Sequence, residues 1–298
     1  MQVFNIYNCL YVTSASTKMS DLIIYKHNEL IDNFIFNATE SELQILNYAV
    51  AITNPSWETT HLVYQISVSE LVSTFKTKSK NSYKLYREAL ERLMKRDYVY
   101  KIDNKHYKEN LIIRTATKDD DNDWLEFKFN EYISQRISNL QGIFTKYDIK
   151  HIAMFKSRYA FMLYEFCKMN LRQINKDKEF SKSFTIQDFK ERLDIADKYP
   201  RFSNLETDVL ARAKENINKH SDIKFSYRVK RKGRTPVAIT LIAKYKIDSQ
   251  MLKPENFELV KEVETIATPY GSTKQTEEDK KNSKKNLDNL KGMMGMIK

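Results

Sequence analysis

The stretch of residues 202–234, FSNLETDVLARAKENINKHSDIKFSYRVKRKGR, decides the fold of this 298-residue chain. Its first part predicts a helix from Phe202 to Lys219, because apolar residues recur every three or four positions and therefore share one face. Those residues are Phe202, Leu205, Val209, Ala213 and Ile217. The opposite face carries Asn204, Thr207, Asp208, Ala211, Lys214 and Asn218.

After the helix, the spacing of apolar residues changes to two, which predicts a β-hairpin. The alternation runs over residues 223–229 and returns over residues 237–245. The tip, residues 228–234, reads RVKRKGR and has five basic residues in seven. Gly233 gives the turn its backbone freedom, and Pro236 begins the return strand, where a missing N–H is tolerated. A helix followed by a hairpin with a basic tip is typical of a winged helix, which places the helix in a DNA groove and the basic loop on phosphates.

The excess of positive charge lies in the same part of the chain. Residues 150–248 hold 23 Lys and Arg against 12 Asp and Glu, whereas residues 1–149 hold 18 against 19 and residues 249–298 hold 9 against 8. The formal net charge of +11 is therefore carried by the middle segment. This concentration favours an anionic polymer or surface as the partner, and the alternative is a basic surface that only keeps the protein in solution.

The first half of the chain predicts helices and strands in a winged-helix order. Thr39 and Glu42 form a capping box that opens a helix from Ser41 to Thr53, and Asn54-Pro55 ends it. Ser69 is expected to cap a short helix that runs through Phe75, and a longer helix from Asn81 to Arg96 is expected to bury Tyr86, Leu90, Leu93 and Met94. Strands are expected at residues 22–25, 34–36, 62–68, 98–102, 111–115 and 125–129.

The second half repeats this order. A helix over residues 156–171, a short strand at 184–185 and a short helix over 186–193 precede the helix and hairpin quoted above. The predicted fold class is therefore α+β, with two tandem winged-helix domains and a polar, disordered C-terminal tail. The expected segments are a lead-in at 1–21, a first domain at 22–145 for dimerisation and possible DNA contact, a second domain at 146–248 for the main DNA binding, and a flexible tail at 249–298.

Motifs for catalysis and metal binding are missing from the sequence. No G-x-x-x-x-G-K-[ST] phosphate loop occurs, no two of the five histidines lie two residues apart as a metal-dependent nickase would need, and no Cys–His cluster has zinc spacing. The acidic run Asp119–Asp123 lacks the Gly and Glu of a calcium loop and is interpreted as a solvated loop tip. We therefore expect no enzyme activity, no cofactor and no metal.

The two cysteines and the hydropathy pattern indicate the compartment. Cys167 lies beside apolar Phe166 in a predicted helix and is expected to be a buried structural thiol. Cys9 and Cys167 suggest no disulfide framework, which favours a reducing compartment. No apolar run is long enough to span a membrane, and no basic residue precedes the apolar stretch near the N-terminus, so neither a membrane anchor nor a secretory signal is expected. The expected location is the cytoplasm.

Four short strings resemble a known family, the iteron-binding initiators of plasmid replication. Residues 24–31 (IYKHNELI) and 38–46 (ATESELQIL) are similar to the N-terminal signature of that family. Residues 217–223 (INKHSDI) and 231–236 (RKGRTP) are similar to the sequence before and within its basic wing. The resemblance spans about residues 22–246, and the lead-in and the tail lie outside it.

The resemblance implies a function as well as a fold. Members of the family have two winged-helix domains, and a monomer binds direct repeats at the plasmid origin, helps to open the duplex and recruits host replication proteins such as the helicase and the host initiator. A homodimer formed through the first domain is in equilibrium with the monomer and often represses the initiator's own promoter. These proteins are not catalysts. The first domain departs from this pattern, because its net charge is close to zero and one of its loops is acidic. The sequence therefore does not decide whether this domain contacts DNA.

The expected DNA-binding residues fall into three groups. The helix contributes Arg201, Ser203, Asn204, Thr207, Ala211 and Lys214, the hairpin contributes Arg228, Lys230, Arg231, Lys232 and Arg234, and the first domain contributes Lys78, Lys80, Lys84 and Arg87. Asn204 is suited to adenine and Thr207 to a thymine methyl group, whereas the hairpin cations are suited to phosphates. The alternative for Asn204 and Thr207 is a polar surface, and for the first-domain group a solvated helix face or a dimer surface.

Two other functions use parts of the same pattern. A winged-helix transcriptional regulator without an origin function has the same DNA chemistry, and only the family resemblance favours the initiator. A nickase or primase is the second alternative, and the missing histidine and phosphate-loop motifs speak against it.

Overall fold

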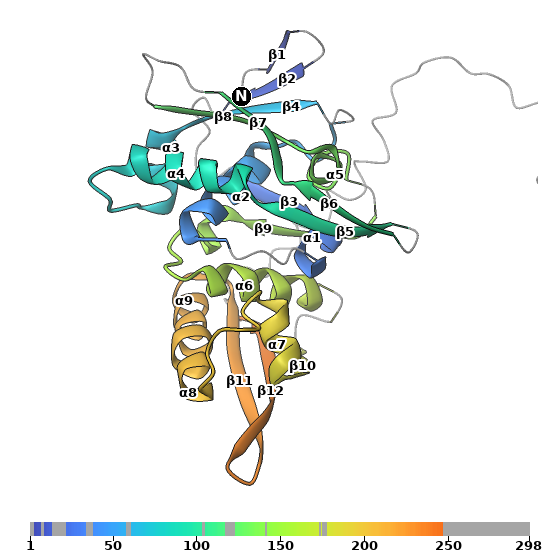
Figure 1. The fold of residues 1–298 in the computed structure, drawn as a ribbon, viewed down its shortest axis with the longest axis vertical. Coiled ribbons are helices and arrows are strands. Elements are labelled where there is room, and N and C mark those ends of the chain that lie inside the picture. The colour runs from blue at the N-terminus through green and yellow to red at the C-terminus, as the bar shows by residue number, and fades with distance from the viewer. Residues whose placement is uncertain are drawn as a thin grey trace, which may run out of the picture. The chain divides into compact units, whose positions relative to one another are not determined.

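A five-stranded sheet organises the first half of the chain (Figure 1). Its strand order is β1 (Val3–Ile6), β2 (Cys9–Thr13), β4 (Leu62–Ser67), β8 (Trp124–Phe129) and β7 (Ile112–Ala116). The strands β2 and β4 are parallel, and the other neighbours are antiparallel. This computed structural model describes residues 3–6, 9–13, 22–33, 38–57, 61–102, 105–116, 123–140, 142–172, 174 and 178–246.

Helices and two antiparallel ribbons complete the first half. The helices are α1 (Asn28–Asn33), α2 (Glu40–Ile52), α3 (Val68–Phe75), α4 (Ser82–Met94), α5 (Glu131–Ser134) and the 3-10 turn η2 (Ile149–His151). The ribbons pair β3 (Ile23–His27) with β9 (Phe144–Asp148) and β5 (Asp97–Ile102) with β6 (Lys105–Asn110). Because α2 packs against α3, α4, α6 and β3, nearly all of its residues are buried.

The second half is a helical layer packed on a three-stranded antiparallel sheet. The strands are ordered β10 (Phe180–Thr185), β12 (Thr235–Tyr245) and β11 (Ile223–Lys232). The helices are α6 (Arg158–Leu171), α7 (Ile186–Arg192), α8 (Phe202–Leu205), the π-helical segment η3 (Glu206–Ala211) and α9 (Arg212–His220). The segments α8, η3 and α9 follow one another without a break, so they form the single helix that the sequence predicts from Phe202 to Lys219. We call this unit the recognition helix and the β11–β12 hairpin the wing.

The helix α6 is the element that the two halves share. It packs against α1, α2 and β9 on one side and against α9, β10 and β12 on the other. Its side chains Phe161, Leu163 and Tyr164 are at most 1% exposed.

The Cys167 thiol on α6 is buried, and burial raises its pKa far above the usual value. This confirms the prediction that this thiol is a buried structural group.

Several sequence predictions are confirmed by the structure. The capping box is present, because Thr39 Oγ1 accepts from the Glu42 amide (3.4 Å) and Glu42 Oε2 accepts from the Thr39 amide (2.8 Å). The strands and helices expected between residues 62 and 129 and between 156 and 245 are found within a few residues of their predicted ends. The predicted strand at 34–36, the acidic residues 119–122 and the tail from 249 onward lie outside the described residues.

Other expectations are corrected. The lead-in contains β1 and β2, and β6 was missed because its six residues, KHYKEN, are all exposed and show no apolar alternation. Met94 was expected to be buried but is 40% exposed. The cap of α3 is Ser67 rather than the expected Ser69, so the helix begins at Val68, and the Asp123 carboxylate accepts from Ser67 Oγ (2.6 Å) and from the Ser69 amide (3.2 Å) at this end. Asp123 is therefore a remote helix cap and not only part of a solvated loop tip.

Among the described residues, no helix has the length and apolar character needed to cross a membrane.

Candidate nucleic-acid interface

The recognition helix buries its apolar face, with Phe202 at its start only partly buried, and exposes the other face. Leu205, Val209, Ala213 and Ile217 are fully buried, as their spacing predicts. Leu210 is fully buried as well, because it lies three residues before Ala213 and seven before Ile217 and so shares their side of the helix. The expected contact residues Arg201, Ser203, Asn204, Thr207, Ala211 and Lys214 are all exposed. The exposed face is therefore free to approach a flat or grooved partner.

The wing continues beyond the recognition helix (Figure 1), and its five cations lie within residues 228–234 at its tip. Gly233 has a φ of +60°, which confirms its predicted role in the turn. The strand register shifts between Lys230 and Arg231, so that Arg231 lies opposite Pro236 next to a bulge, where proline is tolerated. The five expected wing contacts Arg228, Lys230, Arg231, Lys232 and Arg234 are all exposed.

Two cation–π contacts join the wing to the recognition helix. The Arg231 guanidinium lies 5.7 Å from the ring centre of Phe202, at the start of the helix. The Lys214 ammonium lies 5.8 Å from the ring centre of Tyr227 on β11. Within the described ranges, no ion pair involves Arg201, Lys214 or any of the five wing cations. The positive charge of this surface is therefore not neutralised by the protein itself, which favours an anionic partner.

The four candidates from the first half form a separate group. Lys78 and Lys80 lie in the turn between α3 and α4, and Lys84 and Arg87 lie in the first two turns of α4. Lys84 forms a long ion pair with Glu88 (3.9 Å), and Arg87 lies over the Tyr83 ring at 5.3 Å. These residues follow one another from the α3–α4 turn into α4, and they do not share an element with the recognition helix or the wing.

Asn218 was assigned to the exposed polar face, and the structure corrects this. Its side-chain Nδ2 donates to the Phe225 carbonyl (2.9 Å), and its Oδ1 accepts from the Phe225 amide (2.7 Å). The amide therefore pairs with β11 as a neighbouring strand would. This contact fixes the angle between the recognition helix and the wing, and it leaves Asn218 occupied within the protein.

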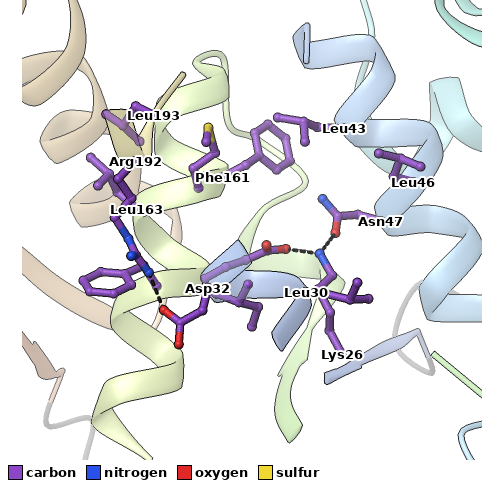
Figure 2. A pocket seen from close by; sticks show the side chains of 14 residues that line it. Lys26, Leu30, Asp32, Leu43, Leu46, Asn47, Phe161, Leu163, Arg192 and Leu193 are labelled. Carbon is purple, nitrogen blue, oxygen red and sulfur yellow. Dashed lines mark hydrogen bonds and ion pairs between the residues drawn. The ribbon is translucent and has the colours of Figure 1, made fainter. Parts of the chain in front are cut away.

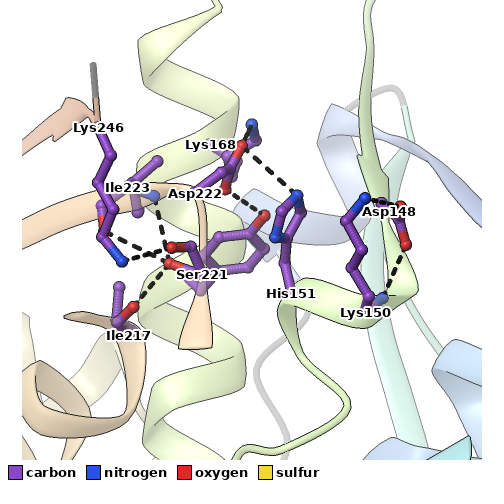
Figure 3. A network of polar contacts seen from close by, with 10 residues as sticks. Asp148, Lys150, His151, Lys168, Ile217, Ser221, Asp222, Ile223 and Lys246 are labelled. Atoms are coloured by element: carbon purple, nitrogen blue, oxygen red, sulfur yellow. Dashed lines mark hydrogen bonds and ion pairs between the residues drawn. The ribbon is translucent and has the colours of Figure 1, made fainter. Parts of the chain in front are cut away.

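A buried polar network lies where the recognition helix turns into the wing (Figure 3). Asp222 accepts from Lys168 Nζ (2.6 Å) and from Tyr164 Oη (2.9 Å), both on α6. Lys246 Nζ donates to the carbonyls of Asn218 (2.7 Å) and Ser221 (2.6 Å), which satisfies oxygens at the C-terminal end of α9. The turn is therefore held to α6 on one side and to the end of β12 on the other.

The charges in this network are matched. Burial by itself would raise the pKa of Asp222, but Lys168, His151 and the two hydrogen bonds together hold this pKa below its usual value. Burial lowers the pKa of His151, although Asp222, 3.9 Å away, opposes the shift. At neutral pH the network therefore contains an ionised Asp222 paired with Lys168 and a neutral His151.

The two halves meet at a small cavity of about 50 Å³ (Figure 2). Lys26 Nζ on β3 bonds to Glu165 on α6 (2.6 Å) and to Asn47 Oδ1 on α2 (2.9 Å). Arg192 at the end of α7 pairs with Asp32 on α1. These pairs hold α6 and α7 against the first half, so the recognition helix has a defined position relative to it.

Two segments of the chain match models of one known protein family. Residues 23–168 match the family model described as Initiator Replication protein, WH1, and residues 185–243 match the one described as Initiator Rep protein, WH2. A curated replication initiation protein of Escherichia coli is 27% identical over 237 residues, which is 78% of this chain and 72% of that protein. A solved structure, that of the Pi initiator protein in complex with iteron DNA, matches with a TM-score of 0.64 and 22% identity, covering 77% of this chain and 99% of that one.

These comparisons confirm the fold class and the family resemblance inferred from the sequence. Two winged-helix domains with mixed helix and strand content follow one another along the chain. The identity to the solved structure is low, so that likeness concerns the fold.

The buried network gives a prediction for Asp222→Asn. The substitution leaves Lys168, whose side chain is 8% exposed, without a counter-charge, so unfolding should become easier by roughly 3–5 kcal/mol at pH 7. Because the folded-state pKa of Asp222 is lowered, its stabilising effect exists above its unfolded pKa near 3.8 and disappears as the pH falls through the folded value. The gap between the two proteins should therefore shrink in acid.

Urea unfolding at pH 7 and at pH 3 measures this difference. Asp197→Asn is the matched control, because Asp197 is exposed and its loss of charge should leave the midpoint nearly unchanged. A midpoint for Asp222→Asn equal to that of the control at pH 7 would contradict a stabilising role for the network.

Proposed function

This chain belongs to the initiator replication protein family, with a WH1 and a WH2 domain, and we propose that it binds duplex DNA at a plasmid origin and starts replication there. One observation carries the proposal: an exposed recognition-helix face lies beside a wing whose five cations have no ion-pair partner within the described residues. The Pi initiator, which has a similar fold, has been solved with iteron DNA. This supports direct repeats as the target of the present chain.

The proposed contacts divide into base reading and phosphate binding. The recognition helix enters the major groove, where Asn204 pairs with adenine and Thr207 and Ala211 meet thymine methyl groups. Lys214 reaches a guanine or a phosphate, and Ser203 and Arg201 bind the backbone near the start of the helix. The wing cations Arg228, Lys230, Arg231, Lys232 and Arg234 bind phosphates of the adjacent backbone.

The remaining partners are also proposals. Monomers bind the repeats and recruit host replication proteins, and homodimers form through the first domain. We assign residues 22–145 to that domain and 146–248 to the main DNA-binding domain. Lys78, Lys80, Lys84 and Arg87 are candidates for additional DNA contacts, and a dimer surface is the alternative for this group. No catalytic step is part of the proposal.

A transcriptional regulator without an origin function remains the second candidate, because the exposed helix and wing suit any duplex. Footprinting the full-length protein on the replicon that encodes it separates the two functions. An initiator should protect a set of direct repeats, and deleting those repeats should abolish replication of the replicon. Protection confined to a promoter, with replication unaffected, would favour the regulator.

Neutralising the wing should weaken binding to every DNA sequence. The logarithm of the binding constant should fall with the logarithm of salt concentration, and Arg201 and the five wing cations together should contribute about −5 to this slope. In Lys230→Gln/Arg231→Gln/Lys232→Gln the magnitude of this slope should drop by about 3, because three contacts are lost. Fluorescence anisotropy over a salt series measures both values.

The control for the wing variant is Lys224→Gln/Lys244→Gln. These two exposed lysines lie opposite each other near the base of the hairpin, away from its tip. The control should keep the slope of the unmodified protein. An unchanged slope in the wing variant would refute the assignment of the wing to phosphates.

Asn204→Ala should change specificity rather than general affinity. Loss of a bidentate contact should relax discrimination at one base pair by roughly 1–3 kcal/mol, while binding to random DNA stays the same. Selection from a random duplex pool, followed by affinity measurements on single-base variants, gives both quantities. Gln187→Ala, an exposed amide on α7, serves as the control. Equal losses on specific and random DNA would show that Asn204 does not read a base.

A further inference from the structure

A groove borders the recognition helix on the side away from the wing. It has a volume of about 350 Å³ and lies between α9 and the segment that joins η2 to α6. Residues that line it include Lys156, Ser157, Arg212, Asn216, Lys219 and His220. We call it the outer groove. None of its basic residues belongs to the contact set predicted from the sequence.

The outer groove and the wing border opposite edges of the exposed helix face. Arg212 and Lys214 are two residues apart, which is about 200° around an α-helix, and Lys219 returns to the side of Arg212 after about two turns. Lys214 faces Tyr227 of the wing, so Arg212 and Lys219 face away from it. Ala211 lies between the two edges. The helix therefore carries cations on both flanks of its base-reading face.

The walls of the outer groove are fixed by the protein. The Lys156 amide donates to Asn216 Oδ1 (2.7 Å), and Asn216 Nδ2 donates to the Arg212 carbonyl (2.8 Å). The Lys156 ammonium lies 3.7 Å from Glu40 Oε1 and 3.4 Å from the Phe75 carbonyl, so it is engaged with the first half. Lys156 therefore positions the wall, and the charges available to a ligand are those of Arg212 and Lys219.

The acidic residues near the groove leave these two cations accessible. Arg212 pairs with Asp208 at 3.4 Å, but both side chains are largely exposed (66% and 42%), and such pairs are weak and easily exchanged. Lys219 forms no ion pair among the described residues, and Glu215 is the acid among the residues that line the groove. Burial and then the neighbouring Lys219, Lys246 and Lys156 lower the pKa of His220, which is consistent with a positive potential there.

A helix in the major groove meets two different DNA strands on its two flanks. The helix is about 10–12 Å wide with its side chains, and the groove is about 12 Å wide, so each flank approaches one sugar–phosphate backbone. Resting on the function proposed above, we propose that Arg212 and Lys219 bind phosphates of the strand opposite to the strand held by the wing. The recognition helix is then clamped to the duplex from both sides.

Neutralising the outer groove tests this assignment. The probe is the duplex that the full-length protein enriches from a random-sequence pool. Arg212→Gln/Lys219→Gln should bind it roughly 10-fold or more weakly at about 0.1 M salt, and the magnitude of the salt slope should fall by about 2. The charge-matched control Lys224→Gln/Lys244→Gln should bind like the unmodified protein. All four replaced side chains are exposed, and thermal unfolding followed by circular dichroism checks that each variant is folded.

Phosphates neutralised one at a time as methylphosphonates then identify the strand. The unmodified protein should lose affinity at positions on both strands. Arg212→Gln/Lys219→Gln should become insensitive on one strand only, and Arg231→Gln/Lys232→Gln on the other. Loss of sensitivity on the same strand in both variants would overturn the proposal.

Failure of this inference is distinguishable from failure of the proposed function. If the wing variant binds weakly while the outer-groove variant binds like the unmodified protein, DNA binding stands and the second anchor does not exist. If neither variant binds more weakly, both phosphate assignments are wrong, and if the unmodified protein enriches no duplex from the pool, the DNA-binding function itself is wrong and the clamp is wrong with it.

Discussion

The ion pair between Asp222 and Lys168 fixes the geometry on which the second half depends. Asp222 stands in the two-residue turn between α9 and β11, and Lys168 stands on α6, the central helix of the core. Two nearly buried charges are costly to desolvate, so the pair is favourable only while its partners are in place. Asn218 binds the Phe225 backbone next to this turn, and these two hydrogen bonds stabilise the observed orientation of the recognition helix relative to the wing. The contacts of Asp222 and Asn218 within the protein therefore determine the distance between the base-reading face of the helix and the phosphate-binding tip of the wing.

The helix α6 also connects the turn at Asp222 to the first half of the chain. Glu165 lies three residues before Lys168 on α6 and receives hydrogen bonds from Lys26 and Tyr147. Burial raises the pKa of Tyr147 well above its usual value, and the adjacent Glu165 adds to the shift, so the phenol remains a neutral donor. One turn of α6 thus anchors the recognition helix through Lys168 and the first half through Glu165. A continuous core that includes both halves follows from this arrangement.

The sequence predicted the features that arise from local periodicity and missed those that arise from distant partners. The buried face of the recognition helix, the capping box at Thr39 and the turn at Gly233 each depend on residues close together in the chain. The start of α3 depends on Asp123, more than fifty residues away, and sequence spacing does not show it. Asn218 was misassigned for the same reason, because its position on a helix indicates exposure but not a nearby strand that can bind it. The exposed candidate residues were found by type and position, and their assignment to DNA stays a prediction.

The distribution of charge separates specificity from affinity. The recognition helix itself, residues 202–219, holds three acidic and three basic residues, so it has no net charge, whereas the wing tip holds five basic residues and no acid. The base-reading side chains Asn204, Thr207 and Ala211 on this helix are uncharged, so their contribution must come from matching the base edges and not from the phosphates. A purely cationic tip gains equally from every sequence. Because the buried turn holds the two at a fixed distance, phosphate binding by the wing positions the helix for reading. An acidic residue introduced at the tip would weaken this positioning, and an additional lysine in the centre of the helix would raise affinity for all DNA at the expense of discrimination.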